Sequence, residues 1–208
     1  MSDRDAFDAF TAKWRARWPE WALADVFVPA AQRDAAVAWW ALLDEWAEAA
    51  WGGSEPAPGL AKLAWWQDEL RGWGKGARRH PLGAVLQRAP APWAALADAL
   101  PALRTRDLPA RGIDAVRDAL QPLGAAMTEI ELALFGGPSA DPGAVAVALA
   151  TPYLPAESRV AETAHSRFGS RVRRLHAALE SLRADAHTRS RAIPRWRVLL
   201  AAWRAARN

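Results

Sequence analysis

Apolar residues recur at helical spacing along nearly the whole chain, in segments that are separated by Pro and Gly. Residues 4–18 carry aromatic residues on one face and end before Pro19, which predicts an amphipathic helix. Residues 29–50 are apolar on two faces and end at Gly52-Gly53, which is typical of a helix at the centre of a bundle. Further helices are expected over residues 58–73, 80–88, 92–106, 110–135, 142–150, 156–186 and 192–207. The pattern predicts one all-α domain of seven to nine helices spanning residues 1–208.

Composition supports this fold class. The chain of 208 residues holds 50 Ala and 13 Trp against 3 Ile and 10 Val, so strand-forming residues are scarce. A hydrophobic content of 51% excludes a disordered chain. The absence of cysteine excludes disulfides, thiolate zinc sites, iron–sulfur clusters and thiol nucleophiles.

The first residues and the hydropathy pattern indicate where in the cell the protein is expected. The first residues are charged and lack the basic-then-apolar order of a secretory signal. No stretch has the roughly 18 uninterrupted apolar residues of a transmembrane segment. We therefore expect a cytoplasmic protein without a transmembrane segment, and peripheral contact with the inner membrane remains open.

Charge is divided unevenly along the chain. Residues 1–154 hold 15 Lys and Arg against 19 Asp and Glu, whereas residues 155–208 hold 12 Arg against 4 acids. No nucleic-acid-binding motif accompanies these arginines, so no nucleic-acid partner is expected. The segment 155–208 is interpreted as basic terminal helices with a solvated outer face.

One pair of carboxylates is the main candidate for metal chemistry. Asp44 and Glu48 are four residues apart, so they project from the same face of the helix expected over residues 29–50. Facing carboxylates inside a helical bundle can hold Mg²⁺ and bridge it to a substrate diphosphate. The alternative is an acidic strip on the surface of one helix.

Tryptophan is concentrated in two successive helices. Seven Trp residues lie between Trp39 and Trp73. They could line a long apolar pocket for a prenyl or acyl chain, or they could fill the core of the bundle.

The order of several short motifs resembles that of the squalene/phytoene synthase family. The resemblance covers about residues 25–88 and is closest to the divergent branch that includes mitochondrial complex I assembly factors. The matching stretches are Phe27-Val28-Pro29, Arg33, the Trp-rich segment 37–46, Ser54-Glu55-Pro56, the segment 63–70 and His80-Pro81-Leu82.

This resemblance implies a class I isoprenoid synthase fold, shortened here in its C-terminal half. It also implies condensation of two prenyl diphosphates, with Mg²⁺ held between two Asp-rich motifs. Alignment places the first motif on Ala47, Glu48 and Trp51, of which only Glu48 is acidic. Asp44 lies just before the motif, and no second acidic motif appears near residues 141–165.

These observations predict a degenerate, non-catalytic member of that family. We expect it to bind a prenyl or other lipid-like molecule, or a protein partner in a scaffold or assembly role. The residues expected to form the ligand pocket are Trp40, Leu43, Glu45, Trp66 and Arg33. The alternative is an active Mg²⁺-dependent prenyltransferase of isoprenoid, carotenoid or hopanoid biosynthesis, with Mg²⁺ at Glu48 and Asp44.

Overall fold

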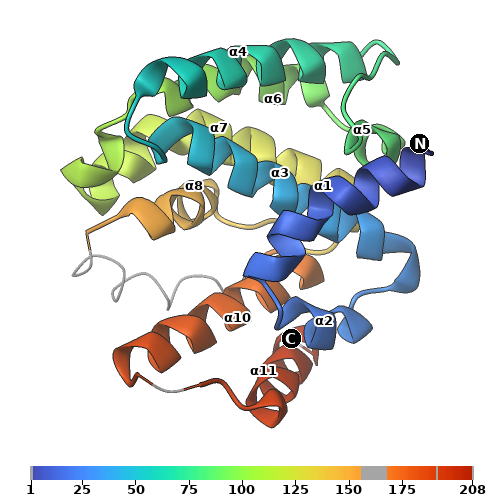
Figure 1. Ribbon diagram of the computed structural model, residues 1–208, viewed down its shortest axis with the longest axis vertical. Helices are drawn as coiled ribbons and strands as arrows, with labels where there is room; N and C mark the ends of the chain where they lie inside the picture. Colours follow the sequence, from blue (N-terminus) through green and yellow to red (C-terminus); the bar gives the residue numbers. More distant parts are fainter. Residues whose placement is uncertain (1, 156–167, 191, 208) are drawn as a thin grey trace.

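The computed structural model describes residues 2–155, 168–190 and 192–207 (Figure 1). Within these residues the chain forms a single helical domain with ten α-helices and no strand, which confirms the all-α prediction. The α-helices are α1 (Asp3–Arg17), α2 (Trp21–Ala24), α3 (Arg33–Trp51), α4 (Pro56–Trp73), α5 (Gly83–Leu86), α6 (Trp93–Ala99), α7 (Ile113–Phe135), α8 (Pro142–Ala150), α10 (Arg171–Thr188) and α11 (Arg195–Arg207). Short 3₁₀ turns connect them: η1 (Asp25–Phe27), η2 (Ala30–Gln32), η3 (Leu100–Arg104), η4 (Leu108–Arg111) and η5 (Thr151–Tyr153).

Three helices, α1, α8 and α10, begin at a side chain that accepts a hydrogen bond from one of their first backbone N–H groups. Ser2 and Asp5 form a reciprocal capping box at the start of α1. Asp141 accepts a hydrogen bond from the Ala144 backbone N–H at 2.7 Å and begins α8, and Ser170 begins α10 in the same way. These capping hydrogen bonds define where three of the helices around the candidate site begin.

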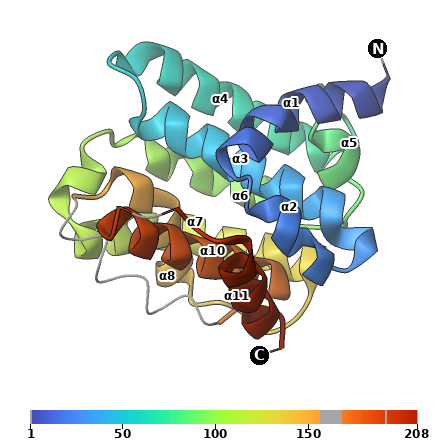
Figure 2. The same ribbon diagram turned by 60° about the horizontal axis from the view of Figure 1, so that its bottom comes forward.

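The helices are arranged in layers around α3 and α7 (Figures 1 and 2). α4 and α6 cover one side of this central pair, and α8, α10 and α11 lie toward the other side. α1 crosses α3 at the front of the view in Figure 1. Most residues of α3 are buried, so the expectation of a central helix over residues 29–50 is confirmed, although α3 itself begins at Arg33.

Two glycines allow helices to touch through their backbones. A Cβ atom added at Gly124 on α7 would lie 2.0 Å from the carbonyl oxygen of Pro142, and one at Gly59 on α4 would lie 2.0 Å from that of Ala49. Only glycine permits these approaches, because any side chain would overlap the neighbouring backbone.

Several helix boundaries differ from the expected ones. The single turn α2 was not expected, because four residues are too few to show a helical period. The helix expected over residues 92–106 is divided into α6 and η3, whose second residue is Pro101. The helix expected over residues 156–186 is described only from Arg171, since residues 156–167 lie outside the described part. None of the described helices is both long and apolar enough to cross a bilayer.

Candidate functional site

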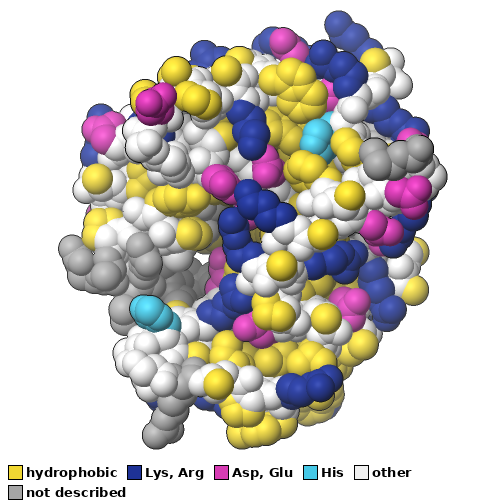
Figure 3. Space-filling view, in the orientation of Figure 1, with side chains coloured by type: hydrophobic (Ala, Val, Ile, Leu, Met, Phe, Trp, Pro, Cys, Tyr) yellow, Lys and Arg dark blue, Asp and Glu magenta, His cyan; other side chains and the backbone are white. Residues whose placement is uncertain are grey.

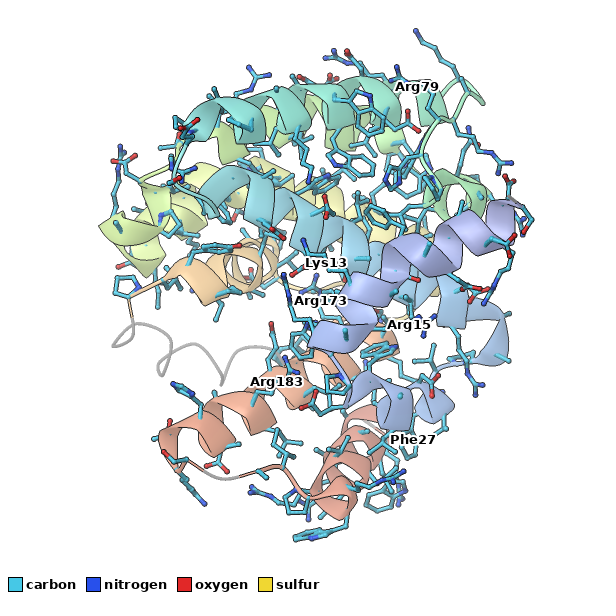
Figure 4. The ribbon with its side chains drawn as sticks, in the orientation of Figure 1. Lys13, Arg15, Phe27, Arg79, Arg173 and Arg183 are labelled. Atoms are coloured by element: carbon cyan, nitrogen blue, oxygen red, sulfur yellow. The ribbon has the colours of Figure 1, made fainter. Side chains whose placement is uncertain are left out.

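A hollow opens where α1, α3, α7, α8 and α10 meet. The hollow is open on one side, and the space between its walls is about 570 Å³ when the solvent at that opening is included. In Figure 4 the labelled Lys13 and Arg173 lie near the centre of the view, where α1 and α10 approach this region. The lining residues are Trp14, Trp18, Trp40, Leu43, Asp44, Ala47, Met127, Val145, Ala148, Leu149, Pro152, Arg173, His176, Ala177 and Glu180.

The hollow has an apolar floor and a charged rim. On the floor, Trp14, Met127 and Val145 are 2% exposed or less. At the rim, the Asp44 and Glu180 side chains are 24% and 27% exposed. This gradient suits an amphipathic molecule that places its apolar chain inside and its polar end at the opening.

A buried ion pair lies beside Trp40, with its arginine lining the hollow. The Arg173 side chain on α10 binds Glu131 on α7 through both carboxylate oxygens, with 2.6 Å between Arg173 Nε and Glu131 Oε2. Trp39 also donates to Glu131 from its indole nitrogen at 2.8 Å. The Arg173 guanidinium lies 5.3 Å from the ring centroid of Trp40. Because Arg173 is matched by Glu131, it adds little net charge to the floor.

His176 forms an aromatic wall with two tryptophans. Its imidazole stacks on Trp40, with ring centroids 3.8 Å apart and planes 15° apart, and it lies 4.4 Å from the Trp18 ring. His176 Nδ1 is 3.7 Å from the Glu180 carboxylate at the rim. This wall joins α10 to α3 and to the residue that follows α1 through stacked ring faces.

The carboxylates of α3 are engaged by cations of α1. Arg17 pairs with Asp44, and Lys13 Nζ lies 2.8 Å from Glu48. Burial raises the pKa of Asp44, and the Arg17 guanidinium opposes that shift in part. The hydrogen bond from Lys13 lowers the pKa of Glu48. The carboxylates that a metal site would need are therefore already paired with cations of the protein.

The residues that the structure describes do not fit a magnesium–diphosphate cluster. Such a cluster needs several carboxylates from facing helices to offset the charge. Among the described residues, no three His, Asp or Glu side chains gather closely enough to hold an ion. In the window where the second acidic motif was expected, Asp141 caps α8, and residues 156–165 lie outside the described residues.

The five expected pocket residues do not come together. Trp40 and Leu43 line the hollow. Trp66 is 1% exposed and packs against Trp46 and Trp73 on the other side of α3. Glu45 pairs with Lys62 of α4, and Arg33 donates to the carbonyl of Val28 at 3.2 Å.

Other lining residues were not predicted from the sequence, because the patterns of the segments that hold them had a simpler interpretation. Trp14 and Trp18 belong to the amphipathic helix at the start of the chain, where they were expected only to pack. Arg173, His176 and Glu180 lie in the basic segment that was interpreted as a solvated surface. A helical wheel of residues 171–188 places these three on one face, since they are spaced by three and four residues.

A second buried carboxylate has a structural role. Glu69 on α4 is 1% exposed and accepts hydrogen bonds from Trp73 Nε1 and from the backbone N–H groups of Arg79 and His80. Arg79 Nε donates to it as well, at 2.9 Å. Glu69 thereby fixes the loop that leads from α4 to α5.

Comparison of the chain with protein-family models, with curated proteins and with solved structures gives no match.

Proposed function

We propose that this protein binds a small molecule with a prenyl or other lipid-like chain in the hollow between α1, α3, α7, α8 and α10, and that it does so without catalysis. The observation that carries the proposal is the apolar floor beneath a charged rim. Ligand pockets have this character, with mostly apolar walls and a few polar groups that orient the ligand.

The aromatic wall supports an extended apolar ligand. Trp14, Trp18, Trp40 and His176 present rings to the hollow from three helices. Rings offer large rigid surfaces with few rotatable bonds, so little conformational entropy is lost when a chain packs against them.

The ion pairs at the rim support a role without catalysis. Ionising a prenyl diphosphate requires strong charge stabilisation of the leaving group, which metal ions supply when carboxylates hold them. Here Asp44 and Glu48 are neutralised by Arg17 and Lys13. We therefore propose that the chain is a degenerate relative of the squalene/phytoene synthases, with an isoprenoid-synthase-like fold that keeps the pocket and lacks the magnesium clamp.

Thermal unfolding with a matched ligand series tests the function. Farnesol, dodecanoate and farnesyl diphosphate are each added with and without MgCl₂. A ligand at about 100 times its Kd stabilises the folded state by about 2.7 kcal/mol, which raises the Tm of a chain of this size by roughly 5–10 °C. We expect such a rise for at least one ligand, of equal size with and without Mg²⁺.

Two results would overturn the proposal. If none of the three ligands raises the Tm, the hollow is only imperfect packing between helices. If farnesyl diphosphate releases pyrophosphate in a Mg²⁺-dependent reaction that Glu48→Gln abolishes, the protein is an active prenyltransferase.

A further inference from the structure

The last helix exposes an apolar stripe that the packing of the domain does not use. On α11, Trp196, Leu199 and Trp203 are 64%, 40% and 44% exposed. Their spacing of three and four residues places them on one face of the helix. An adjacent face of the helix packs in the core, where Val198 and Ala202 are 1% exposed or less.

Arginines flank this stripe. α11 contains four Arg and no acidic residue. Arg197 is paired with Asp185, whereas Arg195, Arg204 and Arg207 form no ion pair within the described part of the chain. The guanidinium of Arg207 lies 4.6 Å from the ring centroid of Trp203. The exposed face thus combines two tryptophans with uncompensated positive charge.

The apolar surface extends beyond α11. Val26 on η1 is 58% exposed, and η1 packs against α11. Figure 3 shows hydrophobic side chains gathered at the lower edge of the molecule, over α11, with Lys or Arg beside them. Figure 2 shows α11 brought forward at this end of the domain, away from α4 and α6.

We propose that this α11 surface, made of Val26, Trp196, Leu199, Trp203, Arg195, Arg204 and Arg207, docks on an anionic lipid membrane. Tryptophan favours the boundary between headgroups and acyl chains, because its ring is apolar and its N–H is polar. Arginines beside it are attracted by anionic headgroups. A helix with an apolar face and basic flanks lies in the plane of such an interface.

Charge favours a membrane over a second copy of the chain. Two copies that met through this surface would bring six of these arginines together without an acidic residue of α11 between them. An anionic bilayer supplies the opposite charge instead. The inference does not rest on the proposed ligand function, because the stripe lies outside the hollow.

Vesicle flotation tests the apolar part of the surface. The full chain is mixed with vesicles of phosphatidylcholine alone, or of equal parts phosphatidylcholine and phosphatidylglycerol. We expect flotation only with phosphatidylglycerol, and at least about tenfold weaker binding for Trp196→Ser/Trp203→Ser. Leu199→Ser should weaken binding, whereas Leu60→Ser on α4 should not, although both leucines are 40% exposed.

A charge-matched pair of variants tests the basic part. Arg204→Gln/Arg207→Gln should reduce binding about tenfold or more, because each arginine near an anionic surface contributes about 1 kcal/mol. Arg15→Gln/Arg88→Gln removes the same charge from exposed positions outside α11 and should leave binding unchanged. Circular dichroism of every variant checks that the helices remain.

Three outcomes would overturn the proposal. The first is equal flotation with and without phosphatidylglycerol. The second is equal loss of binding for both double arginine variants, which would assign the effect to net charge. The third is a dimer, measured by light scattering, that Trp196→Ser/Trp203→Ser dissociates, since the stripe would then be an interface between copies.

Discussion

Arg173 on α10 and Glu131 on α7 form an ion pair in which neither side chain is more than 5% exposed. The pair joins helices that are about 40 residues apart in sequence, at the floor of the hollow. Since a charge is costly to bury alone, each partner depends on the other for its place in the core.

Removing one partner should therefore be far more harmful than removing both charges. Arg173→Met leaves the Glu131 carboxylate buried with only the Trp39 N–H, and should lower the free energy of unfolding by about 3–5 kcal/mol. Arg173→Met/Glu131→Gln keeps an acceptor for Trp39 and should recover more than half of that loss. Urea denaturation of the three proteins measures both effects. A double variant no more stable than Arg173→Met would contradict this account.

The His80 imidazole should make stability depend on pH. Burial lowers the pKa of His80 to about 4, and its Nδ1 accepts a hydrogen bond from the Leu82 backbone N–H at 3.2 Å. The unfolded chain takes up this proton near pH 6.5 and the folded chain only near pH 4. Stability present above pH 6.5 is therefore lost as the pH falls toward 4, by about 3 kcal/mol.

His80→Asn provides the control for this titration. The amide oxygen of Asn can accept the Leu82 N–H without titrating. Because carboxylates titrate in both proteins, the prediction concerns the difference between their stability curves over this pH range. The wild type should lose more stability than His80→Asn, and parallel curves would show that His80 does not carry the effect.

Gly124→Ala should destabilise the protein although alanine is the better helix former. Helix propensity alone predicts a gain of about 1 kcal/mol. The new Cβ would lie 2.0 Å from the Pro142 carbonyl oxygen, so α7 and α8 must separate. Overpacking of this kind costs about 1–3 kcal/mol or more, and we expect a net loss and a Tm lower by several degrees.

Gly74→Ala is the matched comparison for this substitution. Gly74 has ordinary helical dihedral angles, and its added Cβ would meet its nearest atom at 3.6 Å. Its stability should be unchanged or slightly raised, because alanine restricts the unfolded chain. Differential scanning calorimetry compares the two variants, and an equal effect at both positions would refute the close contact between α7 and α8.

The sequence predicted the parts of this fold that depend on local pattern. Helical spacing, Pro and Gly placed α1, α3, α4 and α7 to within a few residues. The hollow could not be found in this way, because its lining comes from five helices that the chain brings together only on folding. Trp40 and Trp66 have equally apolar surroundings in sequence, yet Trp40 of α3 lines the hollow, whereas Trp66 of α4 packs against Trp46 of α3 and Trp73. That difference depends on how α3 packs between its neighbours.

The pairing of the rim carboxylates with cations of α1 could not be predicted from the sequence either. The helical period predicts that Asp44 and Glu48 share a face, and the structure has both pairing with residues of α1. The partners Lys13 and Arg17 are four residues apart as well, so the two cations of α1 have the same helical spacing as the two carboxylates of α3. Nothing in either segment alone indicates that these faces meet, since their contact depends on the crossing of α1 over α3.

The measurement that tests the ligand-binding account most directly is the Kd for farnesol in two variants of α8. Ala148→Phe adds a ring to a half-buried position that lines the hollow, whereas Ala144→Phe adds the same ring one turn earlier, outside the lining. Isothermal titration calorimetry should show binding by the wild type and Ala144→Phe with similar Kd, and binding at least about tenfold weaker in Ala148→Phe, a loss of about 1.4 kcal/mol. Equal affinity in all three proteins would contradict the account.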